Sequence, residues 1–203
     1  MGANLSEETM LKRGFILFTA GAAVMLAAGW LAFPRALYRA QTQPVDFDHA
    51  AHTVKSEMEC SSCHEYRADG TFAGIPKVES CGLCHSEPVG ETENERKIVD
   101  EYITPGKEIP WLVYSRQPIN TRFSHSVHTE RAKIECERCH GDHGKTKSLR
   151  PYEYNVVSGY SRDIWGTSIS RMRRQPHEGM KMDDCMGCHQ ERGAVAGCLG
   201  CHR

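Results

Sequence analysis

The 203-residue sequence has no cysteine outside one repeated motif, no excess of positive charge and only one apolar run long enough to span a membrane. With no cysteine left over, a disulfide framework would have to use the motif cysteines and would leave the histidine after each pair unexplained. Lys and Arg total 25 against 26 Asp and Glu, for a net charge of −1. That balance does not indicate the strongly basic character typical of nucleic-acid-binding domains, and we expect no nucleic-acid partner.

The ten cysteines form five C-x-x-C pairs, and a histidine follows each pair directly. The pairs are Cys60 and Cys63, Cys81 and Cys84, Cys136 and Cys139, Cys185 and Cys188, and Cys198 and Cys201, and the histidines are His64, His85, His140, His189 and His202. Two thiols at this spacing can add to both vinyl groups of one haem, and the adjacent histidine then binds the iron. The motifs therefore predict five covalently attached c-type haems.

Other uses of C-x-x-C fit less well. Zinc ribbons and redox dithiols share the cysteine spacing, but neither requires a histidine after every pair. Two cysteines only two residues apart also bridge poorly as a disulfide. We therefore favour haem attachment over all three alternatives.

Five haems leave roughly 30 residues each in the part of the chain outside the membrane run, too few for separate apolar cores. We expect the haems themselves to form the core. The predicted fold class is a multihaem cytochrome c, mostly coil with short helices around stacked haems, plus one N-terminal transmembrane helix.

Residues 14–33, GFILFTAGAAVMLAAGWLAF, are uncharged and largely apolar, and 20 such residues span a bilayer as a helix. Basic residues lie on both sides of this run, so the positive-inside rule does not orient it. Haem attachment to C-x-x-C-H in bacteria follows export, so we expect an inner-membrane protein with a single N-terminal helix and its haem domain in the periplasm. A cleaved signal peptide is the alternative, but its apolar region is normally shorter.

An internal repeat with an offset of 76 residues indicates two haem modules. The pattern F-x-H-x-x-H begins at Phe47 and again at Phe123, and each time seven residues separate it from the following C-x-x-C-H motif. The predicted division is a membrane anchor at 1–40, a first haem module at 41–86, a linker at 87–120 and a second haem module at 121–203 with an insertion at 144–176.

Electron-transfer haems favour a second strong axial ligand, because a fixed six-coordinate iron reorganises little on reduction. The histidines outside the motifs are the candidates for this role: His49, His52, His125, His128, His143 and His177. Five bis-histidine haems need ten histidines and the chain has eleven. The surplus is explained either by a histidine that binds no iron or by a sixth, non-covalent haem.

The F-x-H-x-x-H units with their following motifs resemble the start of class III cytochromes c, the small three- and four-haem periplasmic carriers. The resemblance implies that His49 binds the iron held by His64, and that His125 binds the iron held by His140. It also implies that His52 and His128 reach other haems. The long gap between His140 and Cys185 departs from that family's pattern.

With the anchor, the paired repeats, the Y-S-R-Q-P segment at 114–118 and the closing pair of motifs, the chain resembles the multihaem cytochrome subunits of Qrc-type menaquinone reductase complexes. The cytochrome subunit of alternative complex III is a related alternative. The Qrc resemblance implies a non-catalytic subunit that accepts electrons from a soluble periplasmic class III cytochrome c. It implies as partners the iron-sulfur and polytopic membrane subunits that pass electrons toward menaquinone.

Two other functions compete with this interpretation. A quinol dehydrogenase resembling NapC and NrfH shares the anchor but is not expected to show the F-x-H-x-x-H repeat. A terminal multihaem reductase usually needs an open iron, as with C-x-x-C-K, and that motif is absent from the sequence. We therefore expect no catalytic residue in this chain.

Overall fold

The computed structural model describes residues 2–71, 73–115, 120–160, 180–194 and 197–202. The chain divides into two compact units, Met1–Arg39 with Tyr154–Gly159, and Ala40–Glu153 with Tyr160–Arg203. Helices supply most of the regular structure. The one sheet among the described residues pairs strand β1 (Tyr38–Gln41) with strand β2 (Tyr152–Asn155). The expectation of helices with little sheet is met.

The N-terminal unit contains a long helix. Helix α1 (Gly2–Ala27) continues through the π-helical turn η1 (Ala28–Ala32) into α2 (Phe33–Leu37). The stretch Glu7–Leu37 contains a window with a mean hydropathy of 2.0, and none of that window is buried. The helix extends beyond the apolar run because its polar flank is also helical, with Lys12 paired to Glu8 at 2.7 Å. By length and composition it is able to cross a membrane.

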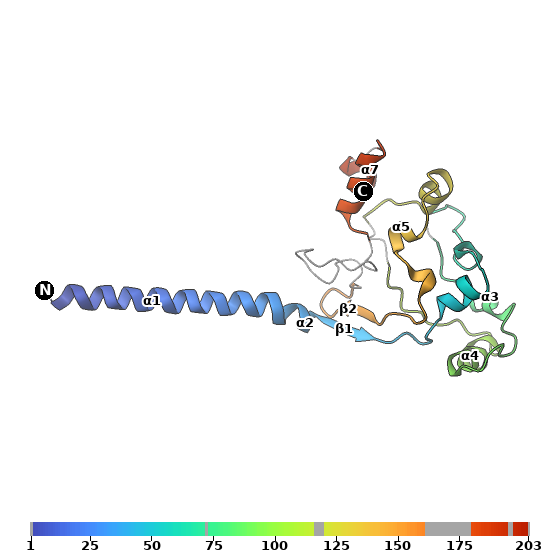
Figure 1. The fold of residues 1–203 in the computed structure, drawn as a ribbon, viewed down its shortest axis with the longest axis horizontal. Coiled ribbons are helices and arrows are strands. Elements are labelled where there is room, and N and C mark those ends of the chain that lie inside the picture. The colour runs from blue at the N-terminus through green and yellow to red at the C-terminus, as the bar shows by residue number, and fades with distance from the viewer. Residues whose placement is uncertain (1, 72, 116–119, 161–179, 195–196, 203) are drawn as a thin grey trace. The chain divides into compact units, whose positions relative to one another are not determined.

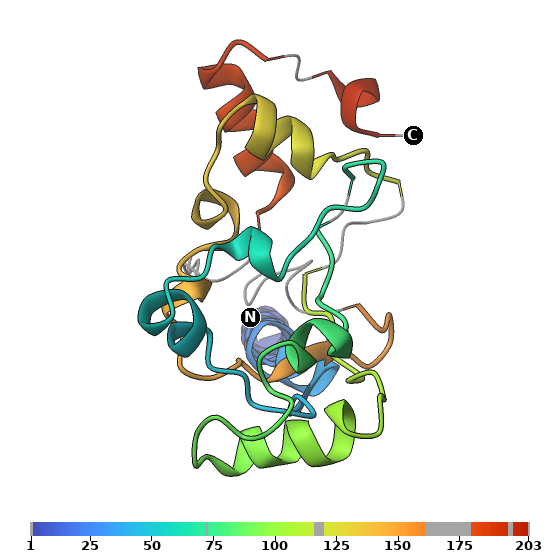
Figure 2. The same ribbon diagram turned by 90° about the vertical axis from the view of Figure 1, so that its right-hand side faces the viewer.

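The second unit consists of short helices joined by long irregular segments (Figure 1), and Figure 2 shows the same pattern from the side. Its buried apolar side chains form one small cluster, with Ile103 and Trp111 packed against it. The buried members are Val45, Val78, Ile98, Val99, Tyr102 and Ile109. Four of these six lie within 87–120, so the segment expected to be a linker supplies most of the buried apolar cluster.

Within that segment, helix α4 (Glu93–Ile98) begins at a capping residue. The Thr92 hydroxyl accepts a hydrogen bond from the Glu95 N–H at 3.2 Å. Acidic residues occupy the first turn and Arg96 and Lys97 the last, which suits the helix dipole. The π-helical turn η4 (Val99–Ile103) continues α4 and carries the buried Val99 and Tyr102.

The two F-x-H-x-x-H repeats fold alike. Each leads into a π-helical turn, η2 (Ala51–Lys55) in the first repeat and η5 (Val127–Arg131) in the second. Equivalent backbone N–H groups then donate 3.0 Å bonds, from Met58 to the His52 carbonyl and from Ile134 to the His128 carbonyl. The residues just before these donors have positive φ, 54° in one repeat and 51° in the other. Sequence periodicity is thus matched by a closely similar local backbone.

Candidate functional site

Each C-x-x-C-H motif lies in a short helical turn that draws its cysteines and histidine together. These turns are η3 (Cys60–Ser62), α3 (Val78–Gly82), α5 (Glu137–His140), α7 (Met182–Glu191) and α8 (Cys198–Cys201). In four motifs the histidine N–H donates to the carbonyl of the first cysteine at 2.8–3.0 Å. In α7 the longer helix supplies the turn. The local sequence alone can form this geometry, because every bond joins residues four apart.

The surroundings of several motif cysteines favour the neutral thiol, because burial raises its pKa. None of the ten, all within the described residues, forms a disulfide. Burial raises the pKa of Cys63, Cys81, Cys139 and Cys185 above the ordinary thiol value. Redox dithiols instead depend on a lowered thiol pKa. In the part of the chain that is described, no three His, Cys, Asp or Glu side chains are grouped to hold a metal ion.

Neighbouring motifs lie close enough for their thiols to interact. After burial, the largest cause of the raised pKa of Cys63 is the thiol of Cys84, which belongs to the second motif. For Cys136 the next cause after burial is Cys60 of the first motif, and for Cys139 it is Cys188 of the fourth. The first motif therefore neighbours the second and third, and the third neighbours the fourth.

Each repeat phenylalanine contacts both histidines of its own repeat. Phe47 stacks on His52 with ring centroids 4.5 Å apart and an interplanar angle of 18°. It meets His49 edge-on at 4.8 Å and 80°. In the second repeat, Phe123 stacks on its second histidine at 4.5 Å and 21° and meets its first edge-on at 4.8 Å and 87°. Both repeats therefore hold one aromatic ring against two histidines in nearly the same geometry.

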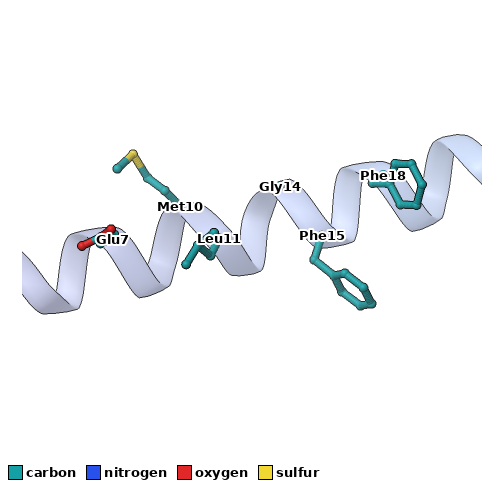
Figure 3. Close-up of a pocket in the computed structure, with 6 residues that line it drawn as sticks. All are labelled: Glu7, Met10, Leu11, Gly14, Phe15 and Phe18. Atoms are coloured by element: carbon teal, nitrogen blue, oxygen red, sulfur yellow. The ribbon is translucent and has the colours of Figure 1, made fainter.

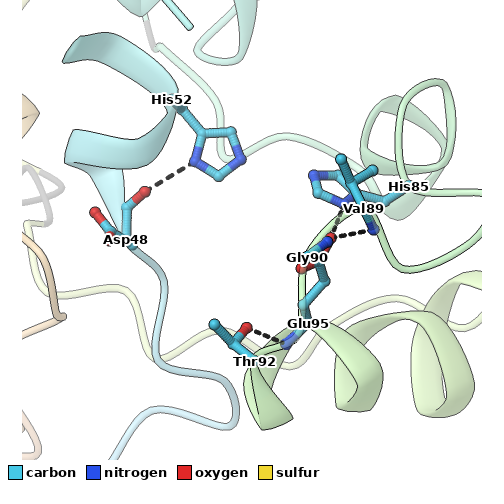
Figure 4. Close-up of polar contacts among 7 residues, drawn as sticks. All are labelled: Asp48, His52, His85, Val89, Gly90, Thr92 and Glu95. Atoms are coloured by element: carbon cyan, nitrogen blue, oxygen red, sulfur yellow. Dashed lines mark hydrogen bonds and ion pairs between the residues drawn. The ribbon is translucent and has the colours of Figure 1, made fainter. Parts of the chain in front are cut away.

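Three candidate distal histidines face motif histidines. The ring centroids are 6.0 Å apart for His52 and His85, 6.2 Å for His125 and His140, and 6.0 Å for His128 and His189. Imidazole–metal bonds are about 2.0 Å long, and a centroid lies about 1 Å behind its nitrogen, so two rings sharing one ion have centroids about 6 Å apart. The spacing of all three pairs fits an iron bound between them. Figure 4 shows His52 directed toward His85.

Hydrogen bonds to Nδ1 fix the orientation of these rings. The His52 and His128 Nδ1 atoms lie 2.8 Å from the backbone carbonyls four residues earlier, at Asp48 and Ser124. The His64 Nδ1 lies 2.7 Å from the Gly74 carbonyl. A ring that donates from Nδ1 keeps its lone pair on Nε2, the tautomer that a metal requires.

A carboxylate performs the same task at the second motif. Glu95 Oε1 lies 3.1 Å from the His85 Nδ1 (Figure 4). Desolvation opposes ionisation, but the backbone N–H groups of Val89 and Gly90, together with His85, lower the pKa of Glu95 below its ordinary value. Sequence reasoning missed this residue, although the spacing of Thr92 and Glu95 is that of a capping box.

His49 is neutral at physiological pH. Burial, followed by the nearby His64 and His143, lowers its pKa to about 4. Its Nδ1 lies 3.4 Å from Thr146 Oγ1. A neutral imidazole is the form that binds iron. His143 lies in the 3₁₀ turn η6 (His143–Lys145).

Two sequence predictions lie partly or wholly outside the described residues. His177 is one of them, and the insertion at 144–176 is described only up to residue 160. An open groove lies elsewhere, on the outer surface of α1, lined by Glu7, Met10, Leu11, Gly14, Phe15 and Phe18. Figure 3 shows the larger apolar side chains there pointing away from the helix, so this surface faces the helix's surroundings and encloses no ligand.

Comparisons with known proteins agree with the motif chemistry. The model of the class III cytochrome c family matches residues 31–109 and again 111–202. The chain is 34% identical over 201 residues to the "Menaquinone reductase, multiheme cytochrome c subunit" of Nitratidesulfovibrio vulgaris (Hildenborough), covering 92% of this chain and 89% of that protein. It is 27% identical over 179 residues to the "High-molecular-weight cytochrome c" of the same organism, covering 79% of this chain and 29% of that protein.

Proposed function

This chain belongs to the class III cytochrome c family, and on that premise we propose that it is the electron-transfer subunit of a membrane-bound menaquinone reductase complex. The observation that carries the proposal is the 34% identity, spread over nine-tenths of the chain, to a protein described as such a subunit. The facing histidine pairs support it from the structure, because they suit electron carriers.

The family implies covalently bound haem c. We propose five such haems, attached through the ten motif cysteines and bound on one side by the five motif histidines. His52 would share an iron with His85, His125 with His140, and His128 with His189, as their 6.0–6.2 Å ring spacings support. The burial of His49 beside His64 supports the fourth pairing implied by the family resemblance. His143 and His177 remain as the candidates for the fifth motif.

The protein's own residues keep each ligand in one state. When bound, each haem supplies a one-electron iron couple. Nδ1 acceptors such as the Asp48 carbonyl and Glu95 hold the rings in the metal-binding tautomer, and the repeat phenylalanines restrict their rotation. An iron held by two imidazoles would leave no open position for a substrate, which fits a carrier better than a catalyst.

The exposed apolar helix supports membrane anchoring. We propose that Glu7–Leu37 spans the inner membrane and that the haem modules lie in the periplasm. The two successive matches to the family model support a division into two modules, one on each side of residue 110.

The proposed partners are the iron-sulfur and polytopic membrane subunits of such a complex, with a soluble periplasmic class III cytochrome c as the electron donor. Alternative complex III remains the second candidate assembly. A self-contained quinol dehydrogenase is disfavoured by the two F-x-H-x-x-H repeats, which fold as a matched pair.

Affinity purification of the tagged, haem-loaded chain from its native membrane tests the proposal. We expect it to bring down iron-sulfur and polytopic membrane subunits, in a preparation that reduces a menaquinone analogue with a reduced class III cytochrome as donor. A chain that purifies alone and oxidises menaquinol unaided would establish the quinol dehydrogenase instead. A tagged variant lacking residues 41–203 is the matched control for capture by the helix alone.

A further inference from the structure

The segments that follow the first and third motifs each cross to the opposite repeat. After His64, the chain turns so that the Gly70 carbonyl accepts a hydrogen bond from the Ser126 N–H at 3.1 Å. After His140, the Thr146 carbonyl accepts one from the Ala50 N–H at 3.0 Å. Ala50 and Ser126 are equivalent positions of the 76-residue repeat. The two repeats therefore exchange equivalent contacts.

The exchange includes the threonine that follows each F-x-H-x-x-H pattern. Thr129 Oγ1 lies 2.6 Å from the Tyr66 hydroxyl and bonds to the His125 carbonyl at 2.8 Å. In the other direction, the Thr53 hydroxyl bonds to the carbonyl of Gly144 and lies 3.1 Å from the His49 carbonyl. Each threonine links the first histidine of its own repeat to the other repeat's post-motif segment.

The first histidine of each repeat is itself contacted across the exchange. The His125 Nδ1 lies 3.0 Å from the Thr71 carbonyl, and its ring lies 6.3 Å from that of Tyr66 at an interplanar angle of 25°. The corresponding His49 Nδ1 lies 3.4 Å from Thr146 Oγ1. The opposite repeat therefore contacts His125 through a backbone carbonyl and an aromatic ring, whereas it contacts His49 through a threonine hydroxyl.

We propose that each repeat positions the first iron-binding histidine of the other repeat, and that Tyr66 is the positioning residue for His125. This inference rests on the ligand pairing proposed above. Tyr66 follows the first motif by two residues, so proximity in sequence would assign it to the iron held by His64. Its ring instead lies beside His125, and its hydroxyl contacts Thr129. The His125 ring in turn faces His140, with an interplanar angle of 7°.

The backbone leaves little freedom in this contact. Gly70 has a φ of +66°, and a Cβ added there would clash with Ser126 Oγ. The segment is also fastened at its far end, where the Gly74 N–H donates to the Glu65 carbonyl at 2.8 Å and Tyr66 pairs with Ala73 in an antiparallel bridge. The same segment therefore contacts two histidines, His64 through the Gly74 carbonyl and His125 through the Thr71 carbonyl.

The test compares Tyr66→Leu, Tyr66→Phe and Thr129→Val in the full-length, haem-loaded protein, by redox titration followed with electron paramagnetic resonance. His125→Met and His49→Met mark which signal belongs to the iron of His140 and which to that of His64. We expect Tyr66→Leu to shift the His125-marked signal and move its midpoint potential upward, because a loosened ring loses its hydrogen bond to Thr71. Tyr66→Phe, which keeps the ring, and Thr129→Val should shift the same signal less.

Thr53→Val is the matched control, because it removes the equivalent hydroxyl in the other repeat and should affect only the His49-marked signal. The inference is overturned if the Tyr66 variants shift only the His49-marked signal. It is also overturned if the Tyr66 variants shift no signal although His125→Met does shift one. The ligand proposal then still stands. If His125→Met itself changes no signal, the ligand pairing is wrong, and this inference fails with it.

Discussion

Glu95 Oε1 lies 3.1 Å from the His85 Nδ1, and the two side chains are only 13% and 24% exposed. The same carboxylate accepts hydrogen bonds from the N–H groups of Val89 at 2.6 Å and Gly90 at 2.8 Å. A largely buried carboxylate behind a metal-binding imidazole makes that imidazole a stronger electron donor. The ring of His52 faces the other side of the same histidine.

Glu95→Gln should therefore raise the midpoint potential of one haem. Loss of a charge-assisted hydrogen bond destabilises the oxidised haem relative to the reduced haem by about 1 kcal/mol. That free energy corresponds to about 40 mV for a one-electron couple. Potentiometric titration measures the shift. Glu93→Gln, an exposed position on the same helix, is the control and should leave all potentials in place. Equal shifts of the potential in both variants would mean that Glu95 acts only through its charge and not through its hydrogen bond to His85.

His49→Met should raise the potential of the haem attached at the first motif, because a thioether replaces an imidazole on that iron. Axial ligands span roughly 0.8 V across haem proteins, and we expect a rise on the order of 0.1 V for this exchange. The spectrum of one haem should change, with small shifts elsewhere. Unchanged redox and paramagnetic resonance signals would mean that His49 binds no haem iron.

Replacing residues 1–40 with a cleavable export signal should release a soluble haem protein, because the exposed apolar stretch Glu7–Leu37 is removed. Membrane fractionation with haem staining measures the change. The experiment is done in a strain without the partner subunits, and the full-length chain is the control. Retention of the shortened protein in the membrane would contradict a single-helix anchor, as would a native N-terminus found cleaved by mass analysis.

Haem counting should give five before and after acid–acetone extraction, because thioether bonds survive it and the ten cysteines are used by five motifs. Pyridine haemochrome spectra against protein concentration measure the number. Six before extraction and five after would identify a sixth, non-covalent haem that uses the surplus histidine.

Ile98→Ala should lower the free energy of unfolding by about 2–4 kcal/mol, since Ile98 is 8% exposed within the small apolar cluster. Denaturant unfolding of the haem-loaded protein, followed by far-ultraviolet circular dichroism, measures the loss. Val89→Ala removes a side chain that is 74% exposed and should change stability little. Equal stability of the two variants would mean that 87–120 behaves as the linker its composition suggested.

Local features were predictable where their cause is local. The apolar run of 14–33 lies inside a longer helix, and the 76-residue repeat reappears as paired turns with the same φ at Glu57 and Lys133. The acidic composition around residues 86–101 pointed to a linker, whereas α4 and η4 bury Ile98, Val99 and Tyr102 there. Composition does not reveal this burial, because these few apolar residues lie among charges that remain exposed.

The cysteine and histidine spacing by itself determined the class of protein and predicts five covalent haem sites, because attachment needs only residues that lie within one helical turn. Which histidine faces which was decided by the tertiary structure. His128 and His189 meet across a long stretch of chain, and Tyr66 stacks on a histidine of the other repeat. The acceptors that orient these rings include the backbone carbonyls of Thr71 and Gly74, which any residue carries, so only folding brings them to the site.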